Sequence, residues 1–110
     1  MFRVIIYQQA KEDISRNANW WADNHSIDQA LSWIDTVEKQ LQELSQNPYR
    51  FGFADENGLF QYEIRQVLVG LGSRRSYRGL YTIRDDTVHV LTVLRAEQGA
   101  IEIQDLPATF

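Results

Sequence analysis

The residues best suited to chemistry in this sequence are arginines, and they gather in one stretch, residues 61–95. This stretch holds six of the eleven basic residues against three carboxylates, so it carries +3 while the whole chain carries −4. Guanidinium groups neutralise phosphates and carboxylates through paired hydrogen bonds, but a pKa above about 12 makes them poor proton shuttles. The stretch therefore predicts a site for phosphate or for an acidic partner. Its arginines are Arg65, Arg74, Arg75, Arg78, Arg84 and Arg95.

Cleavage of RNA without a metal ion is one chemistry that such a stretch could support. It needs a base for the 2′-hydroxyl, an acid for the leaving oxygen and cations for the charged transition state. Arg65, Arg78 and Arg95 are the candidate cations. The proton-transfer groups are harder to find, because His89 is the only histidine near these strands and lies between two valines, as a structural residue would.

A structural role is the competing interpretation of the same arginines. Arg65 and Arg78 on neighbouring strands can pair with Glu63, with Asp85 or with a carboxylate on a helix. Arg74 and Arg75 lie in a glycine-flanked loop, where solvated charge is common, and Arg95 ends a strand and can bind an acidic segment of a partner.

Composition excludes several other classes of function. There is no cysteine, there are only two histidines, and no metal-binding carboxylate motif such as D-x-D is present. No metal site or cofactor is therefore expected. The glycines at 70 and 72 do not precede a helix, which excludes a phosphate-binding loop. The apolar runs are far shorter than the ~20 residues of a membrane span, and the acidic net charge argues against general affinity for nucleic acid.

The pattern of apolar residues places these arginines on a sheet within a single domain of residues 1–110. A strand is expected at 2–7, a helix at 8–24 and a second helix from the Ser26 cap to about residue 45. Three strands follow at about 61–69, 77–83 and 88–94, the last two joined by a tight turn at residues 85–86. Residues from about 97 to 110 form a tail.

The order of elements predicts an α+β fold, β-α-α-β-β-β, in which a helical hairpin packs on one face of an antiparallel sheet. The helices carry apolar stripes that face each other and the sheet, and the short connection between them makes them antiparallel. Most large aromatic residues are expected in the core, including Trp33, Tyr77 and Tyr81, and those at 49–53 should attach a loop to it. An exposed Trp20 would instead mark a protein-contact patch.

Several motifs resemble the RelE/ParE superfamily of type II toxins, also called plasmid-stabilisation proteins. Ala10 with Asp13-Ile14 resembles the family's first helix, and Leu44 with Pro48 resembles the end of its second. Tyr62–Arg65 resembles a family strand written E-[LIF]-R. The most specific match is the hairpin from Ser76-Tyr77-Arg78 through Asp85-Asp86 to Val88–Leu94, and the resemblance covers about residues 2–97.

The resemblance implies a cytoplasmic toxin held inactive by a cognate antitoxin, which docks on exposed apolar positions of the hairpin and the sheet edge. RelE-like members cut mRNA at the ribosome, whereas ParE-like members inhibit DNA gyrase by binding it. Arg78 matches a RelE arginine and Arg65 falls where a basic residue is expected. Glu63 stands where RelE-like members have a lysine, and either Arg95 or Ala96 stands at the position of their last arginine. The RelE set also has a tyrosine near the C-terminus, whereas no tyrosine follows Tyr81 here.

The incomplete nuclease set favours a ParE-like toxin that acts on gyrase by protein binding, and leaves enzymatic activity open. The alternative is a RelE-like, metal-independent mRNA endoribonuclease that uses Arg65, Arg78 and Arg95. A third hypothesis is a decayed member that retains only the antitoxin-binding groove. In the leading hypothesis the candidate contact residues are Arg65, Arg74, Arg75, Arg78 and Arg95.

Overall fold

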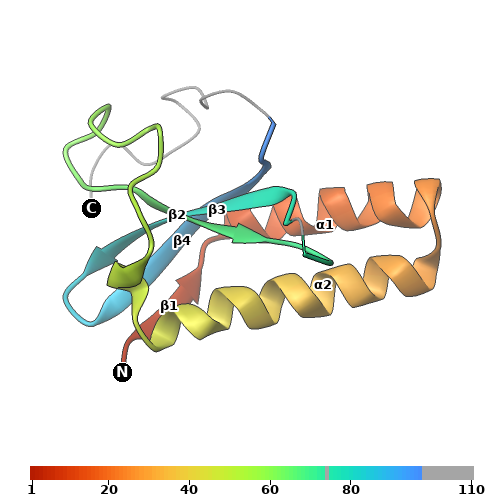
Figure 1. The fold of residues 1–110 in the computed structure, drawn as a ribbon, viewed down its shortest axis with the longest axis horizontal. Helices are drawn as coiled ribbons and strands as arrows, with labels where there is room; N and C mark the ends of the chain where they lie inside the picture. Colours follow the sequence, from red (N-terminus) through yellow and green to blue (C-terminus); the bar gives the residue numbers. More distant parts are fainter. Residues whose placement is uncertain (74, 98–110) are drawn as a thin grey trace.

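A computed structural model of the chain describes residues 1–73 and 75–97, and shows two helices packed on a four-stranded sheet (Figure 1). The order of elements is the predicted β-α-α-β-β-β, so the α+β fold is confirmed. Arg74 and the tail at 98–110, for which predictions were made, lie outside the described residues.

The helical hairpin consists of α1, Gln8–Asn24, and α2, Ile27–Gln42. The Ser26 side chain accepts a hydrogen bond from the Gln29 backbone amide at 3.0 Å, which starts α2 as the capping pattern predicts. Two short 3-10 helices follow, η1 at Glu43–Ser45 and η2 at Pro48–Arg50. The hairpin extends beyond the sheet toward the α1–α2 connection, as Figure 1 shows.

The sheet has the strand order β1-β4-β3-β2, which places the first strand beside the last. Strand β1, Arg3–Ile6, is parallel to β4, Thr87–Arg95. Strand β3, Tyr77–Arg84, is antiparallel to β4 and to β2, Arg65–Val69. The sheet is therefore mixed and not purely antiparallel as predicted, because the long connection from β1 through the helical hairpin, β2 and β3 allows parallel pairing with β4.

The main core lies between the hairpin and the sheet. Fully buried members include Trp33, Val37 and Leu41 from α2 and Tyr81 from β3. Trp33 is completely buried, as its expected place in the core requires, whereas Ile34 of the same helix is only partly buried. Gly79 lies directly under α2, since a Cβ there would stand 3.0 Å from Leu41 Cδ2.

A second, smaller core lies on the opposite face of the sheet, beneath the segment that precedes β2. Its buried residues are Ala54, Ile64, Leu80, Leu91 and Leu94, and Phe60 and Tyr62 pack against it. This segment corrects the predicted strand at 61–69: β2 begins only at Arg65, because residues 60–64 pack on the sheet face instead of extending β2. Phe60 and Tyr62 stack on each other there at 5.4 Å between ring centroids.

Candidate functional site

Arg78, the arginine with the best family match, is buried in an ion pair. Its Nη2 lies 2.9 Å from Glu56 Oε2 and its Nη1 lies 3.0 Å from Glu56 Oε1, which is a two-point contact. Nη1 also donates to Gln66 Oε1 at 3.1 Å. Arg78 is only 5% exposed and Glu56 is fully buried. A carboxylate partner was expected at Glu63, Asp85 or a helix, but the partner is Glu56 in the segment that covers the second core.

Arg65 at the start of β2 is surrounded by aromatic rings and carbonyl groups. Its Cζ lies 4.4 Å from the Phe53 ring centroid and 5.4 Å from that of Tyr49. Its Nη1 donates to the backbone oxygens of Phe51 at 2.5 Å and Tyr49 at 3.3 Å. The expectation that the aromatics at 49–53 attach the loop to the core holds for Phe51, whereas Tyr49 and Phe53 are 54% and 51% exposed.

Arg95 at the end of β4 contacts an exposed tryptophan of α1. Its Cζ lies 4.7 Å from the Trp20 ring centroid, and its Nη1 lies 3.5 Å from Glu97 Oε1. Trp20 is 39% exposed and lines a cavity of about 280 Å³ together with Trp21 and Tyr77. The exposure of Trp20 meets the condition set from the sequence for a protein-contact patch.

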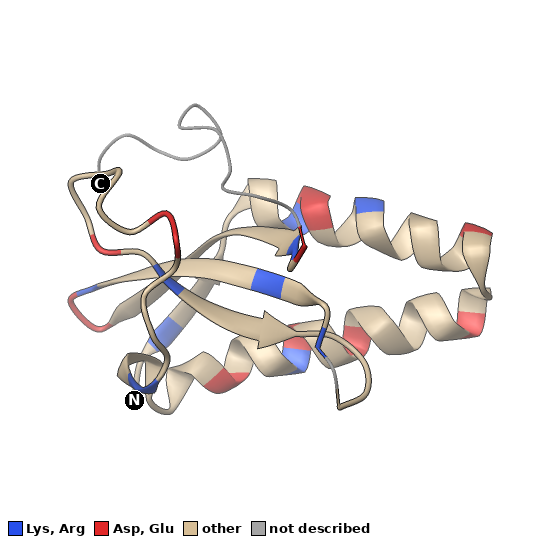
Figure 2. Cartoon of the chain, turned by 45° about the horizontal axis from the view of Figure 1, so that its top comes forward, with Lys and Arg blue, Asp and Glu red and all other residues tan. Residues whose placement is uncertain are grey.

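The candidate arginines do not converge on one open face. Tyr77 packs in the main core beneath the helices and pairs in register with Arg95, whose guanidinium contacts Trp20 of α1. The next residue, Arg78, points to the opposite face, because side chains alternate along a strand. Arg75 is exposed and donates to the Leu68 carbonyl at 3.3 Å. Figure 2 accordingly shows the basic residues as separate bands on different strands.

His89 is held in a pair with Tyr7, whose hydroxyl lies 3.0 Å from His89 Nδ1. Burial, together with the positive charge of Arg84, lowers the pKa of His89 below its ordinary value. Burial also raises the pKa of Tyr7 and of the nearby Tyr62. The arginine whose charge acts on this pair is Arg84, which is not one of the three candidate cations.

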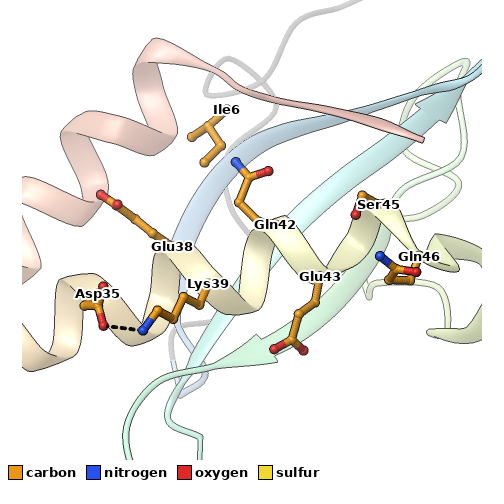
Figure 3. A pocket seen from close by; sticks show the side chains of 8 residues that line it. All are labelled: Ile6, Asp35, Glu38, Lys39, Gln42, Glu43, Ser45 and Gln46. Carbon is orange, nitrogen blue, oxygen red and sulfur yellow. Dashed lines mark ion pairs between the residues drawn. The ribbon is translucent and has the colours of Figure 1, made fainter. Parts of the chain in front are cut away.

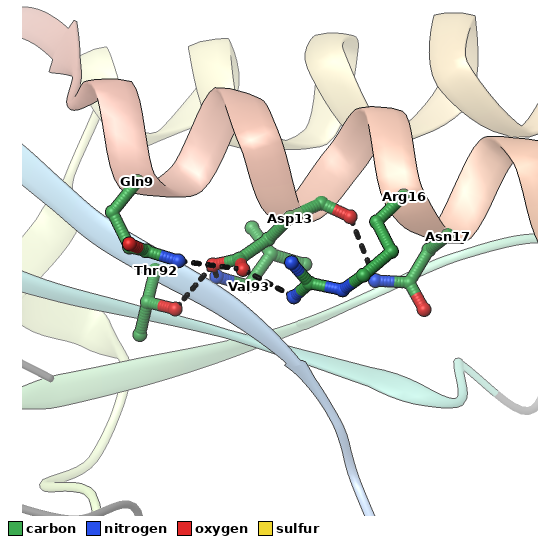
Figure 4. A network of polar contacts seen from close by, with 6 residues as sticks. All are labelled: Gln9, Asp13, Arg16, Asn17, Thr92 and Val93. Carbon is green, nitrogen blue, oxygen red and sulfur yellow. Dashed lines mark hydrogen bonds and ion pairs between the residues drawn. The ribbon is translucent and has the colours of Figure 1, made fainter.

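Asp13 is a buried functional group whose partners sequence reasoning missed. It projects from α1 toward β4, as Figure 4 shows, and accepts hydrogen bonds from Thr92 Oγ1 and from the Val93 backbone amide at 3.0 Å. Gln9 and Arg16 also donate to it, at 3.0 and 2.6 Å. The Val93 amide follows a β-bulge in β4, so Asp13 satisfies a donor near the irregular part of the strand. The sequence did hold one signal that Asp13 is buried: it lies three residues after Ala10, on the apolar stripe of α1.

A groove runs along α2 and continues between the two helices. One part, about 550 Å³, is lined by Ile6 and by side chains of α2 and η1 that include Glu38 and Gln42 (Figure 3). The adjoining part, about 520 Å³, shares Ile6 and Glu38 and adds Ile14 and Ile34. The groove thus combines isoleucines with a charged rim, the chemistry of a site for an amphipathic segment. The rim carries Asp35, Glu38, Glu43, Lys11 and Lys39.

Two further observations limit the chemistry of the described residues. Within 1–73 and 75–97, no group of three histidine, cysteine, aspartate or glutamate side chains is arranged to hold a metal ion. Among the same residues, no helix combines the length and apolar character required to cross a membrane.

Comparison with known proteins gives a family match and a structural match. The family described as "ParE toxin of type II toxin-antitoxin system, parDE" matches residues 4–99. A solved structure titled "Chromosomal ParDE TA system from P. aeruginosa" contains a chain similar to this one, with a TM-score of 0.72 and 14% sequence identity. The match covers 88% of this chain and 98% of that chain, and at this identity it shows a shared fold. Among curated protein sequences, none matches.

Proposed function

We propose that this chain, which belongs to the ParE toxin family and is therefore a toxin of the type II toxin–antitoxin class, inhibits DNA gyrase by binding it. In this proposal the toxin acts in the cytoplasm and a cognate antitoxin neutralises it by binding to it. The proposal assigns the chain no chemical step and no cofactor.

The buried pair of Arg78 and Glu56 is the observation that favours a toxin acting by binding over one that cleaves RNA. An arginine that is 5% exposed and held at two points by a carboxylate cannot also stabilise a phosphate. Opening such a pair leaves an uncompensated buried charge, at about 3–5 kcal/mol. The remaining candidates, Arg65 and Arg95, are engaged by different aromatic residues, the first by Tyr49 and Phe53 and the second by Trp20.

The groove along α2 supports the antitoxin part of the proposal. Its isoleucines, Ile6, Ile14 and Ile34, offer an apolar floor for one face of a helix or extended segment. Acidic residues outnumber basic ones on its rim, which favours basic side chains beside the apolar row of the antitoxin segment. Seating that segment would also cover the surface of α2 between Ile34 and Gln42.

The test is a supercoiling assay with purified gyrase and relaxed plasmid. The proposal expects concentration-dependent loss of supercoiling, reversed when the antitoxin encoded beside this gene is added, with mRNA left intact in a translating extract. Ribosome-dependent cuts in the message, with supercoiling unaffected, would support the endoribonuclease instead. Growth without any defect on expression, together with antitoxin binding, would identify a decayed member of the family.

A further inference from the structure

We infer that Tyr49, Arg50, Phe53 and Arg65 form the surface that contacts the target protein, and that they bind an acidic segment of it. These four residues make up what we call the aromatic–arginine surface. The inference rests on the proposed function, in which the chain acts by binding a protein, and it identifies the part of the chain that does so.

The first observation is that two arginines meet at one short segment, η2 and the residues after it. The charges of Arg65 and Arg50 both act on the Tyr81 hydroxyl, although burial dominates and raises the pKa of Tyr81 to about 12. That hydroxyl donates to the Pro48 carbonyl at 2.6 Å. The Arg50 Cζ also lies 4.6 Å from the Phe51 ring centroid. Two guanidinium groups, one from η2 and one from the start of β2, therefore lie against the same residue, Phe51.

The second observation is that this charge has no counter-ion among the residues that the structure describes. Within residues 1–73 and 75–97, no carboxylate lies within ion-pair distance of Arg50 or Arg65. In the same part of the chain, Arg16, Arg78 and Arg95 each have a carboxylate partner. In a chain of net charge −4, two such arginines side by side make a site complementary to an acidic partner.

The third observation is that the surface is already ordered for binding. Arg65 is fixed by two backbone carbonyls and by the rings of Tyr49 and Phe53, both about half exposed. Tyr49 is held in turn by edge-to-face contact with Phe2, at 5.8 Å between centroids. Tyrosine and arginine are enriched among residues that dominate binding energy, and fixing them in advance lowers the entropy cost of association.

The chemistry of these residues defines the partner. The exposed parts of the two rings can pack against an apolar or aromatic side chain, and the guanidinium groups can donate hydrogen bonds to carboxylates beside it. An acidic segment with an apolar side chain fits both features.

The test measures binding of purified gyrase to the full-length chain at several salt concentrations. Tyr49→Ala/Phe53→Ala should weaken binding about tenfold or more. Arg50→Glu should weaken it and flatten its dependence on salt, because a charge that attracts the partner is reversed.

Two matched controls lie on α2, whose first turns are at the far end of the molecule from η2 in Figure 1. Leu31→Ala removes another exposed apolar side chain, and Gln29→Glu/Ser32→Glu changes the net charge by the same amount as Arg50→Glu. Both controls should bind gyrase within about twofold of the wild-type chain, as expected for exposed positions away from the contact. Thermal unfolding and far-UV circular dichroism confirm that each variant is folded.

The outcomes separate this inference from the proposed function. If the wild-type chain inhibits gyrase and the variants of the aromatic–arginine surface inhibit it equally well, the surface assignment is wrong and the proposed function stands. If the wild-type chain does not bind gyrase, the proposed function fails and this inference fails with it. Binding of single-stranded RNA that the same variants abolish would also overturn the inference, because the surface would then serve nucleic acid.

Discussion

Removing the partner of Arg78 is the perturbation with the largest expected effect on stability. Glu56→Gln keeps the size of the side chain but removes the negative charge that both terminal nitrogens of Arg78 contact at 2.9 and 3.0 Å. Arg78 then remains charged and buried beside the neutral amide of Gln66. Breaking a buried pair from one side lowers the free energy of unfolding by about 3–5 kcal/mol. The whole free energy of unfolding of a native domain is roughly 5–15 kcal/mol, so this loss is a large fraction of it.

Urea denaturation followed by tryptophan fluorescence measures this loss of free energy. In a thermal unfolding experiment on a domain of this size, the same loss should lower the melting temperature by roughly 12–20 °C. Lys39→Met is the matched control, because it breaks the exposed pair with Asp35 and should change stability by about 0.3–0.5 kcal/mol. Glu56→Leu/Arg78→Met should recover most of the loss, since apolar replacements of a buried pair are often neutral. A loss below about 1 kcal/mol for Glu56→Gln would refute the assignment of a buried, paired Arg78.

Three further predictions concern the positions that join the layers. Asp13→Asn should lower the free energy of unfolding by about 1.5–3 kcal/mol, because the charged carboxylate that accepts from four donors becomes a neutral amide. Asp35→Asn is the control on an exposed carboxylate, and an equal loss in that variant would contradict the prediction. Gly79→Ala should lower the free energy of unfolding by about 1–3 kcal/mol, since its Cβ would stand 3.0 Å from Leu41 Cδ2 and 3.3 Å from Val67 Cγ1. Gly52→Ala is the control and should cause no such loss, because there is open space around Gly52. Unchanged urea midpoints for both variants would exclude close packing at Gly79. Because the folded-state pKa of His89 lies below its ordinary value of 6.5, the unfolded chain binds the proton more tightly. The contribution of His89 is therefore complete above pH 6.5 and is lost as the pH falls toward the folded-state pKa. Urea midpoints measured across this pH range should lose that part of their pH dependence in His89→Gln, and an unchanged pH dependence would contradict the prediction.

Local signals in the sequence were sufficient for most elements of the fold, although not for the start of β2. The first helix was predicted at 8–24, the range that α1 occupies, because residues 8–24 contain neither glycine nor proline and carry one apolar stripe. The turn at residues 85–86 was predicted from its two aspartates between strands, and Asp85 adopts the positive φ of 55° that aspartate tolerates there. These features depend on neighbours within a few residues, which a single sequence contains.

The contacts that decide the site depend on residues far apart in the chain. Arg78 and Glu56 are 22 residues apart, and Asp13 and Thr92 are 79 apart, so no spacing rule pairs them. Glu56 lies between the predicted second helix and the next predicted strand, and only the packing of this segment over the second core brings it to Arg78. The parallel pairing of β1 with β4 has the same origin, because it follows from how the hairpin crosses the sheet.

The measurement that tests the account most directly is one gyrase titration with the wild-type chain and with Glu56→Leu/Arg78→Met. If Arg78 holds the fold and the toxin acts by binding, both chains inhibit supercoiling at similar concentrations, and mRNA added to a parallel translating extract stays intact. If the double variant folds yet loses toxicity, and the wild-type chain cuts mRNA while gyrase stays active, Arg78 belongs to a nuclease and the account is wrong.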